Sequence, residues 1–241
     1  MKRILFAFCC LLCCLLCPSQ VDAKEKRMTI TAHTGAYGTP DNTMEFIDVA
    51  LRKSPDIIEI DIRCRPDGTI IMSHDDVQSN DEGVEVDKVM ALMKKTKIRM
   101  NLDIKQDQAI KGMYAIIRKY KMKKQVFMTG VGEERTAVAR RDSPGIKYYL
   151  NCQPDTELIE DPAYQKQLLS TLKKTGSIGV NCDYHYATKT LSKFLHENGY
   201  LLSVWTVNHM EDALRMIQYD VDNITSRKPD IILDAVKDTR K

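Results

Sequence analysis

The sequence predicts an α/β protein, and within that class an irregular (β/α)₈ barrel of the TIM type. Apolar runs of strand type alternate along the chain with segments of helical periodicity. Such alternation is typical of a mainly parallel sheet surrounded by helices. Polar and charged residues also stand at the ends of several strand-type runs, where barrels of this class carry their functional residues. A doubly wound open sheet is the alternative architecture.

Nine segments have the composition of strands, one more than a barrel of eight needs. They are Met28–His33, Ile57–Arg63, Thr69–His74, Ile98–Ile104, Gln125–Thr129, Ile146–Leu150, Ile178–Asn181, Tyr200–Val207 and Asp222–Thr225. We expect Ile178–Asn181 to be the segment that is short or lies outside the barrel. The ~218 residues after position 23 are somewhat fewer than the roughly 250 that are typical of this barrel.

Helices are expected between many of these strands. Apolar residues recur at helical spacing over residues 44–51 and 110–120. Asp161-Pro162 starts a further helix, because proline is favoured in the first turn. Asn198-Gly199 ends another helix, since glycine and asparagine are common just after a helix. The last clear helical pattern covers residues 210–217.

The segment between Asp61 and His74 makes the expected barrel atypical. Only 12 residues separate the two, and they include the turn sequence Arg65-Pro66-Asp67-Gly68. A crossover between parallel strands needs a dozen or more residues, usually with a helix. We therefore expect no full crossover helix at this point of the chain.

The first residues have the pattern of a secretory signal. Lys2 and Arg3 precede the apolar run Ile4–Cys17, and small or apolar residues precede a cleavage position after Ala23. We interpret residues 1–23 as a signal peptide. The protein is then exported, and it is periplasmic or extracellular after cleavage.

Two other interpretations of this segment rank lower. An uncleaved membrane anchor is disfavoured because the apolar run has about 14 residues, against the roughly 20 that span a bilayer. A lipoprotein site at Cys17 is disfavoured because Leu16 stands where a small residue is expected. No repeat, low-complexity tract or linker interrupts the rest, so we expect one domain over residues 24–241.

Charge and cysteine content limit the function classes. The net charge is +3, from 36 basic and 33 acidic residues, with no dense basic run. This balance argues against a nucleic-acid partner. Five of the eight cysteines lie in the signal, and Cys64, Cys152 and Cys182 remain. They lack zinc-ligand spacing, and either one disulfide or three free thiols is compatible with the sequence.

The candidate site residues stand at the ends of strand-type runs. His33 ends the first run and His74 ends the third. Glu59 and Asp61 are at i and i+2 in the second, so their side chains leave the same face of the strand. Asp103 and Lys105 repeat that spacing in the fourth, and Trp205 lies late in the eighth.

These residue types fit one kind of chemistry. Three carboxylates, from Glu59, Asp61 and Asp103, without cysteine ligands suit a hard divalent cation such as Mg²⁺ or Ca²⁺. Two histidines beside such an ion can act as general acid and general base. Lys105 can neutralise an anionic substrate. Together they fit displacement at phosphorus, where a metal offsets charge on the non-bridging oxygens.

The order of the motifs resembles the glycerophosphodiester phosphodiesterase family, a group of irregular TIM barrels of the phospholipase-C-like type. The similarity covers about residues 30–230, nearly the whole chain after the signal. The motifs are Ala32-His33-Thr34-Gly35, Pro40-Asp41-Asn42-Thr43, Glu59-Ile60-Asp61, Pro66-Asp67-Gly68, Ser73-His74-Asp75, Leu102-Asp103-Ile104-Lys105, Val204-Trp205-Thr206-Val207-Asn208 and Asp222-Asn223-Ile224-Thr225 with Lys228-Pro229.

The resemblance implies metal-dependent hydrolysis of glycerophosphodiesters to glycerol 3-phosphate and an alcohol, with a small phosphodiester as the substrate. By carry-over, His33 and His74 are the acid/base pair. The metal ligands are Glu59, Asp61 and Asp103. Lys105 contacts the phosphate and Trp205 flanks the glycerol. The attacking group is either water or the neighbouring glycerol hydroxyl, which gives a cyclic phosphate first.

This sequence departs from the family pattern at four points. Thr34 stands where the family usually has Arg, which removes a charge-assisted phosphate contact. Asp41 and Asp103 each stand where Glu is usual. His74 and Asp103 are only 29 positions apart, which implies a shorter lid and a more open site. Since both histidines and the Glu-x-Asp pair are present, we expect an active enzyme with shifted specificity.

Three alternatives stay open. One is a phospholipase-type activity on intact lipids or other diesters, for which Tyr148-Tyr149-Leu150 or Tyr184-His185-Tyr186 would form an apolar lip. In that case membrane contact arises only through the lipid-derived substrate. Another is a catalytically silent phosphodiester-binding barrel. The third is a shared fold with an unrelated function. The oligomeric state stays undetermined.

Overall fold

The computed structural model describes residues 28–239, which form a closed eight-stranded parallel barrel. The barrel strands are β1 (Thr29–Ala32), β2 (Ile57–Cys64), β5 (Arg99–Ile104), β6 (Val126–Thr129), β7 (Leu150–Asn151), β8 (Gly179–Asp183), β9 (Leu201–Trp205) and β10 (Asn223–Ser226). Seven neighbouring pairs are parallel ladders. A single parallel bridge between Met128 and Tyr148 closes the circle from β6 to β7. The predicted barrel is therefore confirmed.

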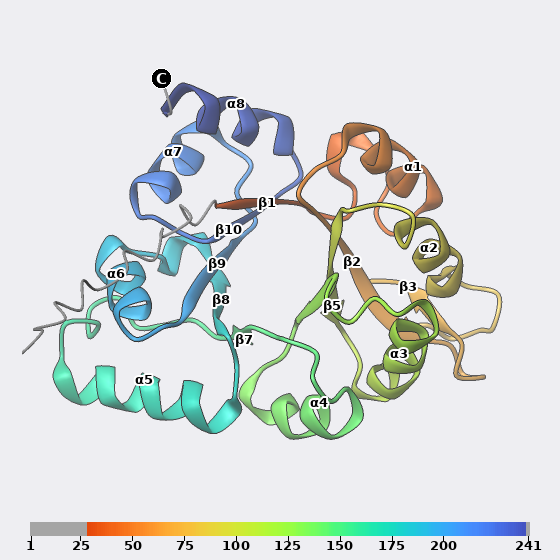
Figure 1. The fold of residues 1–241 in the computed structure, drawn as a ribbon, viewed down its shortest axis with the longest axis horizontal. Coiled ribbons are helices and arrows are strands. Elements are labelled where there is room, and N and C mark those ends of the chain that lie inside the picture. Colours follow the sequence, from red (N-terminus) through yellow and green to blue (C-terminus); the bar gives the residue numbers. More distant parts are fainter. Residues whose placement is uncertain (1–27, 240–241) are drawn as a thin grey trace, which may run out of the picture.

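Helices surround the barrel on its outside (Figure 1). They are α1 (Met44–Lys53), α2 (Val86–Met93), α3 (Asp107–Tyr120), α4 (Thr136–Asp142), α5 (Pro162–Thr175), α6 (Lys189–Glu197), α7 (Met210–Gln218) and α8 (Pro229–Thr239). Short 3₁₀ turns are η1 (Ala36–Gly38), η2 (Glu133–Arg135) and η3 (Tyr184–Tyr186). Over residues 28–239, no helix combines the length and the apolar character needed to cross a bilayer.

The predicted helix boundaries have a visible cause in the structure. The Asp161 side chain accepts hydrogen bonds from the backbone N–H groups of Ala163 and Tyr164, at the start of α5. Pro162 is the first helical residue, as the sequence indicated. α6 ends before Gly199, whose φ of +78° is accessible to glycine at little cost.

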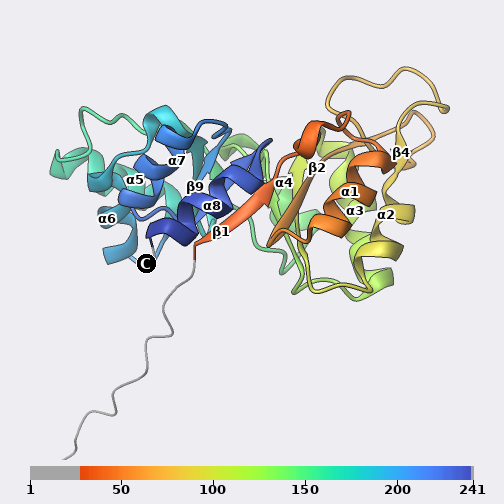
Figure 2. The same ribbon diagram turned by 90° about the horizontal axis from the view of Figure 1, so that it is seen from above.

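The strand outside the barrel is β3 (Ile70–Met72), and the prediction for Ile178–Asn181 was wrong. Residues 179–181 belong to β8, which pairs with both β7 and β9. The chain instead reverses at the turn Arg65–Gly68, so that β3 runs antiparallel to β2 and then pairs with β4 (Val84–Glu85). The expected absence of a crossover helix here is confirmed. Figure 2 shows the segment between β3 and β4 projecting beyond the barrel.

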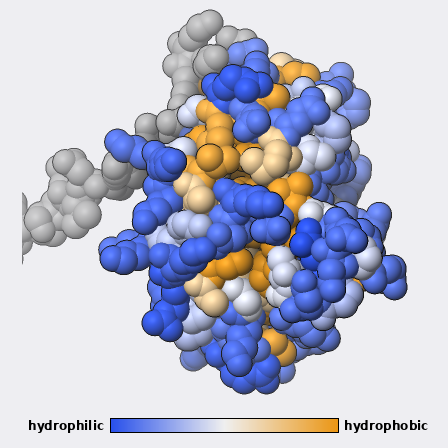
Figure 3. Space-filling view, turned by 90° about the vertical axis from the view of Figure 1, so that its right-hand side faces the viewer, coloured by the Kyte–Doolittle hydropathy of each residue, from blue (hydrophilic) through white to orange (hydrophobic). Residues whose placement is uncertain are grey.

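The apolar core is divided between the two halves of the barrel. One cluster is formed by residues of β1 to β6 and α1 to α4, and a second by residues of β7 to β10 and α5 to α8, with Ile30 of β1. Ile57, Phe127 and Tyr149 form a third, smaller cluster. On the α1 to α3 side, hydrophobic residues show along a central band with hydrophilic residues on both sides of it (Figure 3).

Two sequence-based expectations concern individual segments. Tyr148, Tyr149 and Leu150 are each at most 5% exposed, so they pack in the core and form no lip. Cys64, Cys152 and Cys182 are free thiols, which excludes the disulfide alternative for these three. The predicted signal peptide, residues 1–23, lies outside the residues that the structure describes.

Candidate active site

A cavity of about 450 Å³ opens at the carboxyl ends of the barrel strands. All seven residues that the sequence singled out line it. The lining consists of His33, Asp41, Glu59, Asp61, His74, Asn101, Asp103, Ile104, Lys105, Thr129, Gly130, Arg135, Asn151, Asn181, Trp205, Thr206, Thr225 and Arg227. The fold thus brings residues from both ends of the chain to one place, as strand order in a barrel requires.

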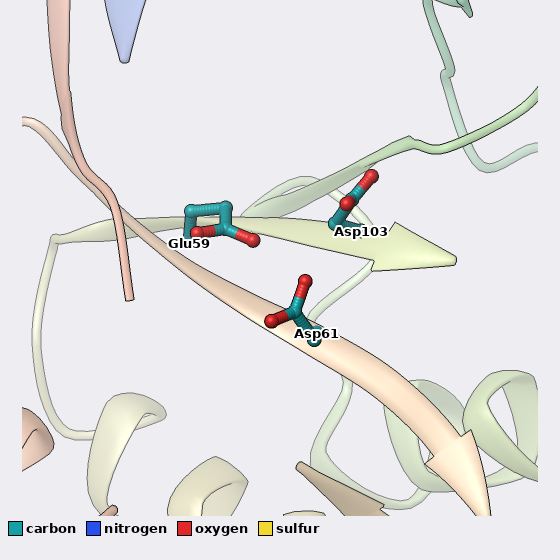
Figure 4. Close-up of side chains that lie close together, drawn as sticks. All are labelled: Glu59, Asp61 and Asp103. Atoms are coloured by element: carbon teal, nitrogen blue, oxygen red, sulfur yellow. The ribbon is translucent and has the colours of Figure 1, made fainter. Parts of the chain in front are cut away.

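Three carboxylates form the floor of this cavity (Figure 4). Glu59 and Asp61 extend from β2, and Asp103 extends from β5 at the position paired with Asp61. One oxygen of each lies within 4.8 Å of the others. Burial raises the pKa of Glu59 well above its usual value, and the negative charges of Asp61 and Asp103 raise it further. A hard divalent cation fits this oxygen donor set, because its charge would offset the mutual repulsion.

Each carboxylate is held through one of its oxygens. Glu59 Oε2 accepts from the Thr34 backbone N–H at 2.8 Å. Asp61 Oδ2 accepts from Asn42 Nδ2 at 2.8 Å, and Asp103 Oδ1 accepts from Thr129 Oγ1 at 2.9 Å. These outer contacts orient the three side chains in advance, as second-shell partners do in metal sites.

Lys105 lies between two of these carboxylates. Its Nζ is 3.1 Å from Asp61 Oδ1 and 2.6 Å from Asp103 Oδ2. Burial acts to lower the pKa of Lys105, but the two carboxylates outweigh it and the pKa is raised above its usual value. The ammonium group therefore stays charged at neutral pH and neutralises part of the acidic cluster.

His33 follows β1 and is fixed by the loop that it begins. Its Nδ1 lies 2.7 Å from the Thr34 carbonyl, which can only accept, so Nδ1 carries the hydrogen and Nε2 is the nitrogen left for chemistry. Burial lowers the pKa of His33; the bond to Thr34 acts to raise it, and the positive charge of Arg227 acts to lower it. The imidazole is consequently neutral at pH 7.

His74 differs from His33 in its setting. It follows β3 in the projecting segment, and its side chain is 67% exposed, against 22% for His33. Its Nδ1 lies 2.8 Å from Asp75 Oδ1, and the preceding Ser73 N–H donates to the Asp61 carbonyl at 3.2 Å. The antiparallel pairing of β3 with β2 therefore brings His74 beside the acidic cluster.

Trp205 ends β9 and borders the same cavity. Its indole Nε1 is buried and has no hydrogen-bond partner within the described part of the chain. A buried N–H without a partner is costly, so this unpaired group is an unusual feature of the residue.

Sequence reasoning missed several polar residues of the cavity. Asn151 on β7 and Asn181 on β8 form an amide pair, with Asn181 Nδ2 3.2 Å from Asn151 Oδ1. Asn151 ends β7, so the strand-end pattern could have indicated it, whereas Asn181 lies in the middle of β8. Arg135 ends the 3₁₀ turn η2 and Arg227 follows β10, and no strand pattern marks either residue.

Arg227 forms an ion pair with Asp41 through two hydrogen bonds. Its Nη1 and Nη2 donate to Asp41 Oδ1 and Oδ2 at 2.6 and 2.8 Å. These hydrogen bonds lower the pKa of Asp41 below its ordinary value, against the opposing effect of burial. Asp41 is thereby engaged outside the acidic cluster, which consists of Glu59, Asp61 and Asp103.

Comparison with known proteins identifies relatives of this chain, although no family model matches it. YhdW of Bacillus subtilis (strain 168), provisionally named a glycerophosphodiester phosphodiesterase, is 24% identical over 235 residues, covering 86% of this chain and 97% of YhdW. A glycerophosphodiester phosphodiesterase of the same organism is 21% identical over 256 residues, covering 85% of each chain. Over most of its length, the chain is therefore similar to glycerophosphodiester phosphodiesterases.

Solved structures agree with this family at the level of the fold. A phosphodiesterase of Oleispira antarctica, solved in complex with the product sn-glycerol 3-phosphate, superimposes with a TM-score of 0.73 at 16% identity. The match covers 87% of this chain and 96% of that chain. The irregular TIM barrel of the glycerophosphodiester phosphodiesterases is thus the fold of this protein.

Proposed function

We propose that this protein is a metal-dependent phosphodiesterase that hydrolyses glycerophosphodiesters to glycerol 3-phosphate and an alcohol. The observation that carries the proposal is the convergence of Glu59, Asp61 and Asp103 with two histidines in one cavity of a glycerophosphodiester phosphodiesterase barrel. Relatives carry this activity in their names, and one solved relative holds glycerol 3-phosphate as a product.

The three carboxylates are the proposed metal ligands. Mg²⁺ or Ca²⁺ held there would offset negative charge on the non-bridging phosphate oxygens as it develops. Lys105, already charged beside Asp61 and Asp103, adds a further positive group on the same side of the cavity. Trp205 lines the same cavity, which supports its proposed place beside the glycerol.

The two histidines divide the proton transfers. The lowered pKa of His33 supports the base role, in which Nε2 removes a proton from water or from the adjacent glycerol hydroxyl. His74, with Nδ1 held by Asp75, then donates a proton from Nε2 to the oxygen of the departing alcohol. The bond from the attacking oxygen to phosphorus forms as the bond to this alcohol oxygen breaks. Where the glycerol hydroxyl is the attacking group, a water molecule then opens the cyclic phosphate to glycerol 3-phosphate.

The test measures glycerol 3-phosphate and alcohol released from a panel of glycerophosphodiesters with different head groups. Wild type is assayed with Mg²⁺, with Ca²⁺ and with EDTA, beside Glu59→Gln and His33→Ala. His209→Ala is the matched control, because His209 is exposed and does not line the cavity. Metal-dependent turnover that both site variants lose supports the proposal. Phosphate binding without turnover on any diester would contradict it and favour a silent binding barrel.

A second candidate is cleavage of intact lipids. The exposed large hydrophobic side chains of residues 28–239 are Leu158, Tyr186 and Met210. They lie on the connections that follow β7, β8 and β9, on the side of the barrel that carries the cavity. Including lysophospholipid and phospholipid vesicles in the same panel tests this candidate, since faster turnover on vesicles than on soluble diesters supports it.

Export is a separate part of the proposal. The sequence pattern of residues 1–23 supports a cleaved signal peptide and a periplasmic or extracellular enzyme. The mass of the mature protein, recovered from an expressing cell, checks this part. A mature chain that begins near Lys24 supports cleavage, and a chain that retains its first residues contradicts it.

A further inference from the structure

We propose that Arg227, fixed by Asp41, binds the phosphate of the substrate on the His33 side of the cavity. This inference rests on the proposed function, because it names a binding residue of that same site. Arg227 is far along the chain from the His33-Thr34-Gly35 motif that follows β1.

The loop after β1 offers no charged donor of its own. Thr34 is 1% exposed, and its Oγ1 accepts from the Asn42 backbone N–H at 2.7 Å. Its backbone N–H is occupied by Glu59. Both polar groups of Thr34 are therefore used to hold the loop and the acidic cluster, and neither is available to a phosphate oxygen.

Arg227 reaches this loop from the connection after β10. A Cβ atom built on Gly35 would lie 2.6 Å from Arg227 Nη1 and 1.8 Å from Asp41 Oδ1. The guanidinium–carboxylate pair thus lies directly over the backbone of Gly35, two residues after His33, and only a residue without a side chain allows this approach. Arg227 consequently places its charge beside the histidine motif.

Asp41 holds the Arg227 guanidinium in place but does not use all of its N–H donors. A guanidinium has five N–H donors, and Asp41 takes one from each Nη. The Arg227 backbone N–H donates to Asn208 Oδ1 at 2.9 Å, which holds the loop as well. The side chain lines the cavity and is 41% exposed. Donors therefore remain for an anionic oxygen in an orientation that Asp41 sets in advance.

The other two cations of the cavity are less suited to this position. Lys105 is engaged with Asp61 and Asp103. Arg135 uses Nε on Asp107 and Nη1 on the carbonyls of Ile104 and Gly130, and so belongs to the β5 and β6 side. Among the cationic side chains that line the cavity, Arg227 is the one whose remaining donors lie beside the loop after β1.

The experiment compares Arg227→Gln and Arg227→Lys with wild type in the full-length mature protein. Isothermal titration with inorganic phosphate and with glycerol 3-phosphate, both in the presence of Mg²⁺, gives Kd without turnover. Turnover of a glycerophosphodiester gives KM and kcat. Because a charged hydrogen bond to phosphate is lost, we expect Arg227→Gln to raise Kd and KM about tenfold or more. The Kd and KM of Arg227→Lys should lie between those of wild type and those of Arg227→Gln, since lysine keeps the charge but not the planar guanidinium.

Asp41 is a positioning residue in this scheme. Asp41→Asn should raise Kd and KM by less than Arg227→Gln does. The double variant should have the same Kd and KM as Arg227→Gln alone, because the two residues act as one unit. Arg141→Gln is the matched control: Arg141 forms a two-hydrogen-bond pair with Asp142 of the same type outside the cavity. We expect it to leave Kd and KM unchanged.

The outcomes separate the two proposals. Unchanged Kd and KM in folded Arg227→Gln, beside an active wild type, overturns the role of Arg227. A wild type that cleaves no glycerophosphodiester, but binds phosphate in a manner that Arg227→Gln weakens, overturns the proposed function and supports the role of Arg227. If Arg227→Gln does not fold, Arg227→Ala assayed with added guanidinium replaces it. Restored phosphate binding then supports a direct contact, and no restoration contradicts it.

Discussion

The two halves of the barrel contribute different kinds of groups to one cavity. Among the residues that line the cavity, the half from β1 to β6 provides all four carboxylates, both imidazoles and the one ammonium, beside the amide of Asn101 and the guanidinium of Arg135. The half from β7 to β10 provides the amides of Asn151 and Asn181, the indole of Trp205 and the guanidinium of Arg227. Each half also has its own apolar cluster. Under the proposed function, one half would carry the bond-breaking chemistry and the other would shape the space for the substrate.

Burial explains why the first half is the less tolerant of change. Glu59 and Asp61 are at most 3% exposed, so each depends on hydrogen bonds from protein groups in place of water. The neutral amides of the second half need only hydrogen-bond partners. Substitutions should accordingly cost most in the first half and least at the surface.

The largest effect is expected for Glu59→Gln. The variant keeps an acceptor for the Thr34 N–H but loses one proposed metal ligand, so we expect no detectable turnover and a metal affinity reduced by more than about 100-fold. In the absence of metal, its unfolding temperature should rise, because one of three adjacent negative charges is gone. Calorimetric titration and thermal unfolding measure both quantities. A metal affinity equal to that of wild type would contradict the assignment of the acidic cluster as the metal site.

The next largest effect is expected for His33→Ala, which should lower kcat by about 10²- to 10⁴-fold and retain the metal affinity. In wild type, the pKa of His33 lies below the ordinary histidine value of 6.5, so the base becomes protonated only at a pH below 6.5. The acid limb of the kcat/KM profile should therefore lie below pH 6.5. A limb above that value would argue against His33 as the base.

Asn181→Ala tests the second half. The change removes an amide that lines the cavity and a donor to Asn151, so we expect KM or head-group preference to change by about tenfold or less. Turnover at saturation should stay within a few-fold of wild type. Steady-state kinetics on the head-group panel measures this, and a loss of kcat as large as that of His33→Ala would remove the distinction between the halves.

The smallest effect is expected for the pH dependence of the Asp41–Arg227 pair. Its side chains are 44% and 41% exposed, so the free energy of unfolding should change by at most about 1 kcal/mol in Asp41→Asn at pH 7. Because Asp41 has a lowered pKa in the folded state, its stabilisation is present above the ordinary value of 3.8 and is lost as the pH falls below it. Denaturant unfolding at both ends of this range checks the sign. A difference that grows in acid would contradict it.

Much of the barrel could be predicted from the sequence because strand ends have a recognisable pattern. Apolar runs that end in His33, Asp61 and Asp103 mark both the strands and the residues that line the cavity. The error over Ile178–Asn181 arose because periodicity does not reveal strand direction. The antiparallel course of β3 follows from the turn at Arg65–Gly68 and from its pairing with β2.

The ion pair between Asp41 and Arg227 could not be predicted in the same way. The two residues are 186 positions apart, and neither lies in a strand. Their contact depends on the closure of β10 onto β1 and on the space left by Gly35, which are properties of the folded chain. Sequence reasoning therefore treated Thr34 and Asp41 as two separate departures from the family pattern.

The division of the core into two clusters has a consequence for how the chain could be assembled from parts. The connection at Pro144-Gly145 is exposed, and a side chain on Gly145 would meet no neighbouring atom. Two separately expressed fragments cut there would each retain most of one apolar cluster, with the carboxylates in one fragment and Trp205 and Arg227 in the other. If they re-associate on mixing, neither fragment alone should turn over substrate, and recovered activity would report complementation.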